Sequence, residues 1–137
     1  MSAIKKITFI VDKLPYKGES SRLALTHCIA SQTVEIHLEE DENVEPVLAF
    51  VGNGVLNCLK NQDANTYGVS TLESHIKNAL LTDIKVLICE EDIKRLGLTE
   101  DTLIMDAEDL GADMTTQIVP FSEIMAEMES SVHLMYF

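Results

Sequence analysis

The sequence predicts one three-layer α/β/α domain built on a mostly parallel sheet of about five strands. Two observations predict this class. Apolar, β-branched runs alternate with segments of helical character along the 137 residues. The apolar runs are continuous rather than alternating, which is typical of strands covered on both faces. The length suits a single domain, and no repeat, low-complexity tract or linker divides residues 1–137.

The first third of the chain predicts two strands and a helix. Residues 5–11 form a β-branched and aromatic run that ends at Asp12, as expected of a buried strand. A helix should begin at a capping serine at position 20 or 21 and continue to about residue 30. Residues 47–51 follow Pro46 and form a second fully apolar run, so we expect a second buried strand there.

The middle of the chain predicts two more helical segments and a third strand. A glycine turn at 52–54 should lead into a short helix at 55–59, and a polar loop should follow at 61–68. The spacing of Leu and Ile predicts a helix over 71–81. Residues 85–89 read Lys-Val-Leu-Ile-Cys, which is typical of a buried strand.

The last third predicts, in order, a short helix at 90–96, brief strands at 103–105 and 116–119, a helix at 120–129 and a final strand at 132–137. Gly97 should end the first of these helices, and Pro120 suits the first position of the second. The final strand is apolar up to Phe137, so we expect it to be held in the sheet or in a subunit contact.

Residues 33–45 form an acidic insertion between the first helix and the second strand, where a short connection is usual. Apolar residues alternate at Val34, Ile36 and Leu38, which indicates a strand or the arm of a hairpin. Two interpretations are open. The segment is either a solvated excursion or an arm that contacts a partner.

The charge excludes several classes of protein. Ten basic and 23 acidic residues give a net charge of −13 at neutral pH. Such a chain lacks the basic footprint that nucleic acid and anionic membranes require. No apolar run is long enough to span a bilayer, and the N-terminus does not resemble a secretory signal. An odd number of cysteines, three, indicates free thiols in a reducing compartment, so we expect a cytoplasmic protein.

Three patterns suggest a ligand site but each lacks an essential part. Gly52 and Gly54 resemble a dinucleotide loop, yet Asn57 occupies the third glycine position, so a tight turn explains them better. Residues 106–113 begin like a calcium loop but lack its later ligands. His37 has no partner at metal-ligand spacing. We therefore expect no cofactor and no metal.

The cysteines differ in their positions. Cys28 lies on the apolar face of the first helix, and Cys58 follows the glycine turn, so packing explains both. Cys89 stands at the carboxyl end of a strand and directly before a helix. That edge of an open α/β sheet is where ligands bind, and a helix N-terminus favours a thiolate. The acidic residues 90–92 oppose this effect because like charges disfavour a thiolate.

The motifs around these positions resemble the DsrE/DsrF/TusC/TusD sulfur-relay proteins. Residues 89–98, Cys-Glu-Glu-Asp-Ile-Lys-Arg-Leu-Gly-Leu, are similar to the Cys…Leu-x-x-Arg-Gly-Leu segment of that family. Residues 50–55 with Leu59 and Gln62 resemble a segment of the DsrF/TusC branch, as do residues 15–18. Asn53 and Leu96 depart from the usual Asp and Arg. The likeness covers most of the chain except residues 33–45.

This resemblance implies a function. Such proteins are three-layer subunits of homo- or hetero-oligomers, and they pass sulfane sulfur as a cysteine persulfide between proteins in sulfur oxidation or tRNA 2-thiolation. The resemblance implies that Cys89 carries the sulfur. Lys94 or Arg95 would then offset the local acids, and the partners would be related subunits and a donor or acceptor protein.

Two other interpretations remain open. In the DsrF/TusC branch the cysteine is often absent or of unclear use, so the chain could instead be a non-catalytic scaffold subunit. A thiol redox sensor is a third reading, and it would need a resolving cysteine, such as Cys58, near Cys89.

Overall fold

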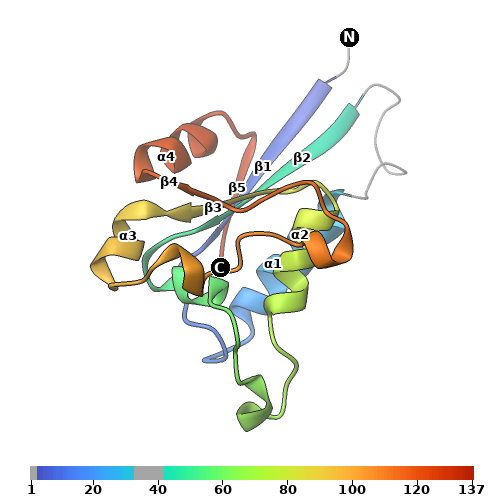
Figure 1. Cartoon of the computed structure of the whole chain (residues 1–137). Helices are drawn as coiled ribbons and strands as arrows, with labels where there is room; N and C mark the ends of the chain where they lie inside the picture. The colour runs from blue at the N-terminus through green and yellow to red at the C-terminus, as the bar shows by residue number, and fades with distance from the viewer. Residues whose placement is uncertain (1–2, 33–41) are drawn as a thin grey trace.

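The computed structural model describes residues 3–32 and 42–137, and its centre is a five-stranded parallel sheet in the order β4-β3-β2-β1-β5 (Figure 1). The strands are β1 (Ala3–Val11), β2 (Glu42–Phe50), β3 (Lys85–Cys89), β4 (Gln117–Val119) and β5 (His133–Tyr136). All four pairings between neighbouring strands are parallel. The predicted fold class is confirmed.

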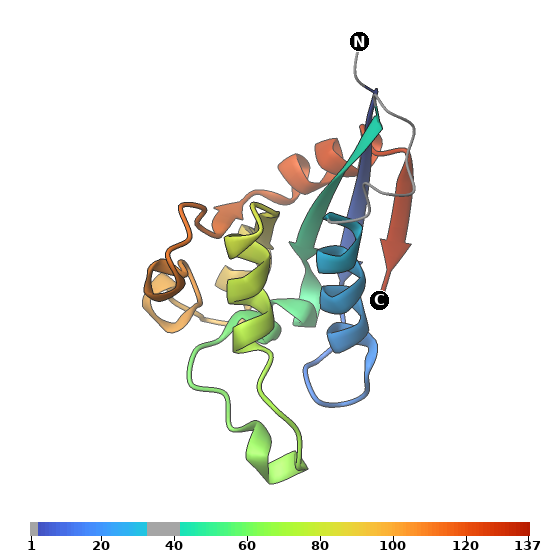
Figure 2. The ribbon, with the colours of Figure 1, turned by 90° about the vertical axis from the view of Figure 1, so that its right-hand side faces the viewer.

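Helices cover both faces of the sheet. They are α1 (Ser20–Gln32), α2 (Glu73–Leu81), α3 (Glu90–Arg95) and α4 (Phe121–Glu129), with short 3₁₀ helices η2 (Gly52–Cys58), η3 (Ala64–Tyr67), η4 (Glu100–Thr102) and η5 (Glu108–Leu110). In Figures 1 and 2, α1 and α2 lie against one face and α4 lies against the other. The central strands are therefore buried on both sides, which explains why their sequences are continuously apolar.

Strand β2 begins earlier than the sequence predicts and contains Pro46. A proline cannot donate a hydrogen bond to a neighbouring strand, so it is normally confined to edges. Here β3 joins β2 only from Val47, whereas β1 pairs with β2 along its whole length. Pro46 therefore lies where β2 still has one neighbour. The last residues of the acidic insertion, 42–45, belong to this strand, and the alternation at 34–38 lies outside the described residues.

One local prediction in a loop is wrong, and the bounds of two others differ from those expected. Residues 103–105 form no strand, although Leu103 and Ile104 are buried. The Ile104 N–H donates to the Cys58 carbonyl at 2.7 Å, which fixes this segment by an isolated contact rather than by a ladder. The helix expected at 55–59 is the 3₁₀ helix η2, which begins at Gly52, and the polar loop at 61–68 contains η3.

The final strand is held in the sheet, as predicted. β5 pairs with β1, and the Phe137 N–H donates to the Ile10 carbonyl at 2.9 Å. Because β5 is an edge strand, every residue of it is exposed, with Tyr136 64% accessible and Leu134 40%. An apolar edge of this kind is available for contact with another chain.

Helix α4 is fixed to its face of the sheet by one carboxylate. Glu127 accepts from Lys6 of β1 at 2.8 Å and from Lys85 of β3 at 2.6 Å. Burial alone would raise the pKa of Glu127, but the hydrogen bonds and charges of the two lysines hold it below its usual value. Thr8, which is fully buried, and Ser131 hydrogen-bond beneath the helix at 2.6 Å.

The carboxyl end of β1 packs directly against the backbone of η2 at Gly54. The Val51 N–H donates to the Val11 carbonyl at 3.0 Å, and the chain then turns into η2. A Cβ atom on Gly54 would lie 2.0 Å from the Val11 oxygen, so no side chain fits there. Gly52 serves a different purpose, since its φ of +55° is a conformation that favours glycine. Glycine is thus favoured at position 52 by the backbone dihedral angle and at position 54 by the lack of space for a side chain.

We expect Gly54→Ala to destabilise the fold by about 2–3 kcal/mol, because the new methyl group would have to displace the backbone at Val11. Gly18→Ala is the matched control, since a Cβ there meets nothing within 4 Å and the change should stay within about 0.5 kcal/mol. Urea denaturation of the two variants measures the difference. Equal losses in both would contradict the steric role of Gly54.

We expect Glu127→Gln to lower stability by about 1 kcal/mol at pH 7, because the charged hydrogen bonds to both lysines are weakened. A lowered pKa stabilises the fold above the unfolded-state pKa and ceases to do so as the pH falls through the folded one. The difference between variant and wild type should therefore disappear in acid. Exposed Glu123→Gln on the same helix is the control, and a difference independent of pH would refute the ion-pair explanation.

Candidate functional site

Cys89 occupies the position at the sheet edge that the sequence predicts. It is the last residue of β3 and the residue before α3, with extended backbone angles of φ −68° and ψ 116°. Neighbouring β2 ends at Phe50, which pairs with Ile88 of β3. Cys89 and the turn at Gly52 therefore lie at the same carboxyl edge of the sheet. The side chain is nevertheless 1% exposed and belongs to the apolar core.

Asp92 joins the first turn of α3 to the start of η2. Its Oδ2 accepts the Gly52 N–H at 2.6 Å, and its Oδ1 accepts from Arg95 Nε at 3.1 Å. Arg95 in turn donates to Asn53 Oδ1 at 3.3 Å. Burial alone would raise the pKa of Asp92, but hydrogen bonds from Gly52, the Cys89 thiol and Arg95 lower it below its usual value. Asp92 is therefore an anion beside the thiol at neutral pH.

Glu91 makes a second connection, to the helix on the other face of the sheet. Both of its carboxylate oxygens accept the Phe121 N–H, at 3.0 and 3.2 Å, at the start of α4. Cys89 Sγ lies 3.9 Å from Glu91 Oε1 and can donate to it. The thiol is thus enclosed by two carboxylates, each of which binds a backbone N–H of a distant segment.

This environment stabilises the neutral thiol. Burial raises the pKa of Cys89 to about 11, the backbone N–H of Asp92 opposes the rise, and the carboxylates of Asp92 and Glu91 add to it. The start of α3 does favour the thiolate through the Asp92 N–H, as predicted, but burial and the two carboxylates outweigh this effect. Lys94 and Arg95 do not offset the effect of these carboxylates on the thiol, because Lys94 pairs with Glu90 at 2.8 Å and Arg95 with Asp92.

The other two cysteines are packing residues, as the sequence indicates. Cys28 and Cys58 are fully buried and free of disulfides. Burial raises the pKa of Cys28 to about 12 and that of Cys58 well above its usual value. For Cys58 to act as a resolving thiol it would have to leave the core.

The other two loops that suggested a ligand site in the sequence are turns and short 3₁₀ helices in the structure. Gly52 and Gly54 begin η2, and residues 106–113 contain η5 with the Asp106 carboxylate accepting the Glu108 N–H at 3.1 Å. Within residues 3–32 and 42–137, no three His, Cys, Asp or Glu side chains gather as metal ligands would. No helix in the same residues has the length and apolar character needed to cross a bilayer.

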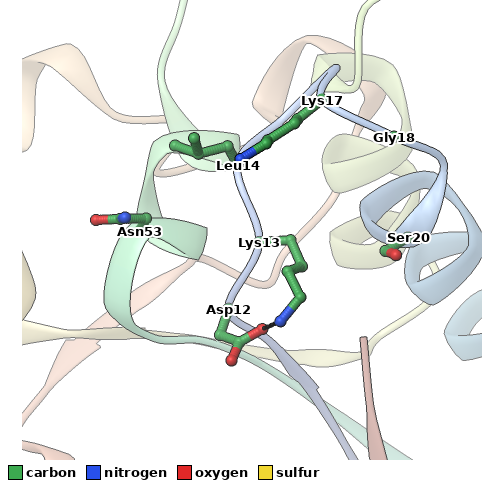
Figure 3. Close-up of a pocket in the computed structure, with 7 residues that line it drawn as sticks. All are labelled: Asp12, Lys13, Leu14, Lys17, Gly18, Ser20 and Asn53. Atoms are coloured by element: carbon green, nitrogen blue, oxygen red, sulfur yellow. Dashed lines mark hydrogen bonds and ion pairs between the residues drawn. The ribbon is translucent and has the colours of Figure 1, made fainter.

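A cavity of about 420 Å³ opens at the same edge, at the carboxyl end of β1 (Figure 3). The loop from Asp12 to Gly18 forms one wall, and Asn53 of η2 forms part of another. Asn53 also accepts from Arg95, which binds Asp92, so this wall is connected to the surroundings of Cys89.

Comparisons with known proteins identify the family of this chain. The sequence matches the DsrE/DsrF-like family over residues 5–136. The chain belongs to the DsrE/DsrF-like family. That family is associated with sulfur relay, and the resemblance in the sequence motifs is thereby confirmed at the family level. A search of curated protein sequences finds no match.

Two solved structures share the fold of this DsrE/DsrF-like chain. The YchN protein of Escherichia coli superposes with a TM-score of 0.77 at 18% identity, covering 97% of this chain and 99% of its own. MTH1491 of Methanobacterium thermoautotrophicum, described as a protein of unknown function, gives 0.63 at 14% identity, covering 94% and 96%. At these identities the likeness concerns the fold alone.

The sequence of this DsrE/DsrF-like chain predicts the position of the Cys89 thiol but not its contacts with Asp92 and Glu91. In the sequence, residues 90–92 count as charges that oppose the thiolate, and nothing assigns them a contact with another segment. In the fold, Asp92 meets a backbone group 40 residues away and Glu91 one 30 residues away. No local pattern carries that information, because both contacts depend on how η2 and α4 pack beside β3.

We expect Asp92→Asn to move the pH midpoint of Cys89 alkylation below about 11 and to speed alkylation at pH 8 by about three- to tenfold, because one of the nearby negative charges is removed. Glu90→Gln is the matched control, since that carboxylate is paired with Lys94 instead. Iodoacetamide kinetics across pH, followed by mass spectrometry, measure both variants. If both shift the midpoint equally, the effect comes from net charge and not from the contact with Asp92.

Proposed function

We propose that this chain is a subunit of a cytoplasmic sulfur-relay complex, closest to the DsrF/TusC branch, and that Cys89 accepts and passes sulfane sulfur as a persulfide. The observation that carries the proposal is the position of Cys89 at the carboxyl edge of the sheet, between β3 and α3 and beside the end of β2, in a chain of the DsrE/DsrF-like family. The free state of all three thiols supports a reducing compartment.

The proposed step is a thiol exchange that needs no cofactor. The Cys89 thiolate attacks the outer sulfur of a donor persulfide, the S–S bond of the donor breaks, and the donor leaves as a thiolate. Cys89 then carries a persulfide, whose outer sulfur an acceptor thiolate takes in the same way. One S–S bond is made and one broken at each stage, so no oxidant or reductant is consumed.

The closed surroundings of Cys89 define what a partner must do. A pKa of about 11 instead of 9.0 lowers the thiolate fraction near neutral pH roughly a hundredfold. A partner that separates Asp92 or Glu91 from the thiol would both expose the sulfur and lower its pKa. A basic partner surface suits this role, because it would compete for the two carboxylates and match a net charge of −13.

A second candidate function is that of a non-catalytic scaffold subunit. Two observations favour it: Cys89 is 1% exposed and protonated, and the edge strand β5 offers apolar side chains for contact with another subunit. In this case the acidic segment at 33–45 would contribute to partner choice. The two candidates share an oligomer of related chains and differ in whether sulfur ever resides on Cys89.

We expect a polysulfide donor to add sulfur to Cys89 slowly on the isolated chain and at least about tenfold faster in the presence of a partner subunit that opens the site. Intact-protein mass spectrometry with peptide mapping measures the loading, and a reducing thiol should reverse it. Cys89→Ser should abolish loading while leaving assembly unchanged, whereas Cys28→Ala, which removes another buried thiol, should leave loading intact.

The outcomes separate the two functions. If sulfur is absent from Cys89 with and without candidate partners, and Cys89→Ser leaves sulfur transfer by the assembled complex unaltered, the scaffold replaces the carrier. If the sulfur is found on Cys28 or Cys58 instead, the assignment of the site is wrong.

A further inference from the structure

A second and larger hollow adjoins the cavity of Figure 3, since Leu14 and Lys17 line both. It is an open groove of about 590 Å³, formed between the loop after β1 and residues 56–63. Leu14 and Pro15 supply apolar surface from one side, and Leu56 and Leu59 supply it from the other. Grooves of this size, with an apolar lining and a few polar groups at the rim, are typical of binding sites.

The wall of the groove is fixed before anything binds. Tyr16, which has a φ of +64°, donates its hydroxyl hydrogen to Gln62 and accepts the Leu72 N–H at 3.0 Å. The Gln62 amide nitrogen donates to the carbonyls of Asn57 and Leu59, both at 2.8 Å. A tyrosine in the left-handed region costs free energy, and here two hydrogen bonds hold it there. The polar groups of the wall satisfy one another and leave the apolar surface open.

The rim carries two lysines with no ionic partner among the described residues. Lys17 and Lys60 both line the groove and are exposed, and neither makes an ion pair within residues 3–32 and 42–137. By contrast, Figure 3, which draws the adjoining cavity, shows Lys13 paired with Asp12. Lys77 likewise pairs with Asp109, and Lys94 with Glu90.

These two cations are unexpected in such an acidic protein. The chain has 23 acidic residues, and most basic side chains find a partner within the described part of the chain, whereas the two at this groove find none there. Asp63 is a carboxylate on the same rim and binds Thr66 at 3.2 Å, so the rim is positive by one charge. Screening confines charge effects to about 8 Å at physiological salt, so an occupant responds to this rim more than to the net charge.

We propose that this groove binds an acidic, apolar peptide segment of a partner protein. The apolar lining would take one or two bulky side chains, and carboxylates beside them would pair with Lys17 and Lys60. An open groove suits an extended or helical segment better than a small molecule, which a protein normally encloses. The inference does not depend on the sulfur chemistry proposed above, since it uses none of the residues around Cys89.

The test uses the full chain and two synthetic pools of peptides about eight residues long. One pool alternates Leu or Phe with Glu or Asp, and the other carries Lys in place of the acids. Peptides retained by the wild-type chain are sequenced and their affinities measured by fluorescence anisotropy. We expect retention from the acidic pool only, and we expect Lys17→Ala combined with Lys60→Ala to weaken binding at least about tenfold.

Two controls separate the groove from general effects. Lys77→Ala combined with Lys94→Ala changes the net charge equally but removes lysines that are paired elsewhere, so binding should stay within about twofold of wild type. Leu56→Ser should weaken binding through the apolar lining, with circular dichroism and thermal melting confirming that the chain is folded.

Three results would overturn the proposal. The first is that neither pool, or only the basic pool, contains a peptide that the wild type retains. The second is that the two lysine double variants lose affinity equally. The third is that dodecanoate, rather than any peptide, binds in a manner that depends on Lys17 and Lys60, since the groove would then take an anionic lipid chain.

Discussion

The fold depends on one close contact at the carboxyl edge of the sheet. The backbone at Gly54 lies against the Val11 carbonyl, where no side chain fits, and the Val51 N–H binds the same carbonyl. This contact fixes η2 across the end of β1. One end of η2 then presents the Gly52 N–H to Asp92 beside Cys89, and the other presents Leu56 to the groove. Both candidate sites are therefore positioned by a single steric constraint.

Cys89 illustrates how burial can outweigh position. The carboxyl edge of a parallel sheet and the start of a helix both favour reactive groups, and the thiol has both. Removal from water and two nearby carboxylates act against the thiolate and prevail in the isolated chain. The same carboxylates hold η2 and α4 in place, so the chemistry of the thiol is linked to the packing of two distant segments. A change in that packing on binding a partner would alter reactivity without a new catalytic group.

The charge distribution divides the surface into regions of different character. The chain as a whole is strongly acidic, with a net charge of −13. The groove at Leu56 is a local exception because Lys17 and Lys60 form no ion pair with any residue that the structure describes. The edge strand β5 is different again, with apolar side chains such as Leu134 and an open side to the ladder. These three surfaces can serve different partners at the same time.

Local patterns in the sequence determined the strands, the main helices and the location of Cys89. Continuous apolar runs fixed the buried strands, and Gly97 marked the end of α3, where its φ of +67° favours glycine. Contacts between distant segments decided the rest. They made residues 103–105 a loop, extended β2 through Pro46 and placed Asp92 and Glu91 beside the thiol. They also left two lysines beside a groove without an ion pair to any described residue. Hydrophobic period and turn chemistry act over a few residues and can be read locally, whereas a pKa or a cavity depends on which atoms the fold brings together.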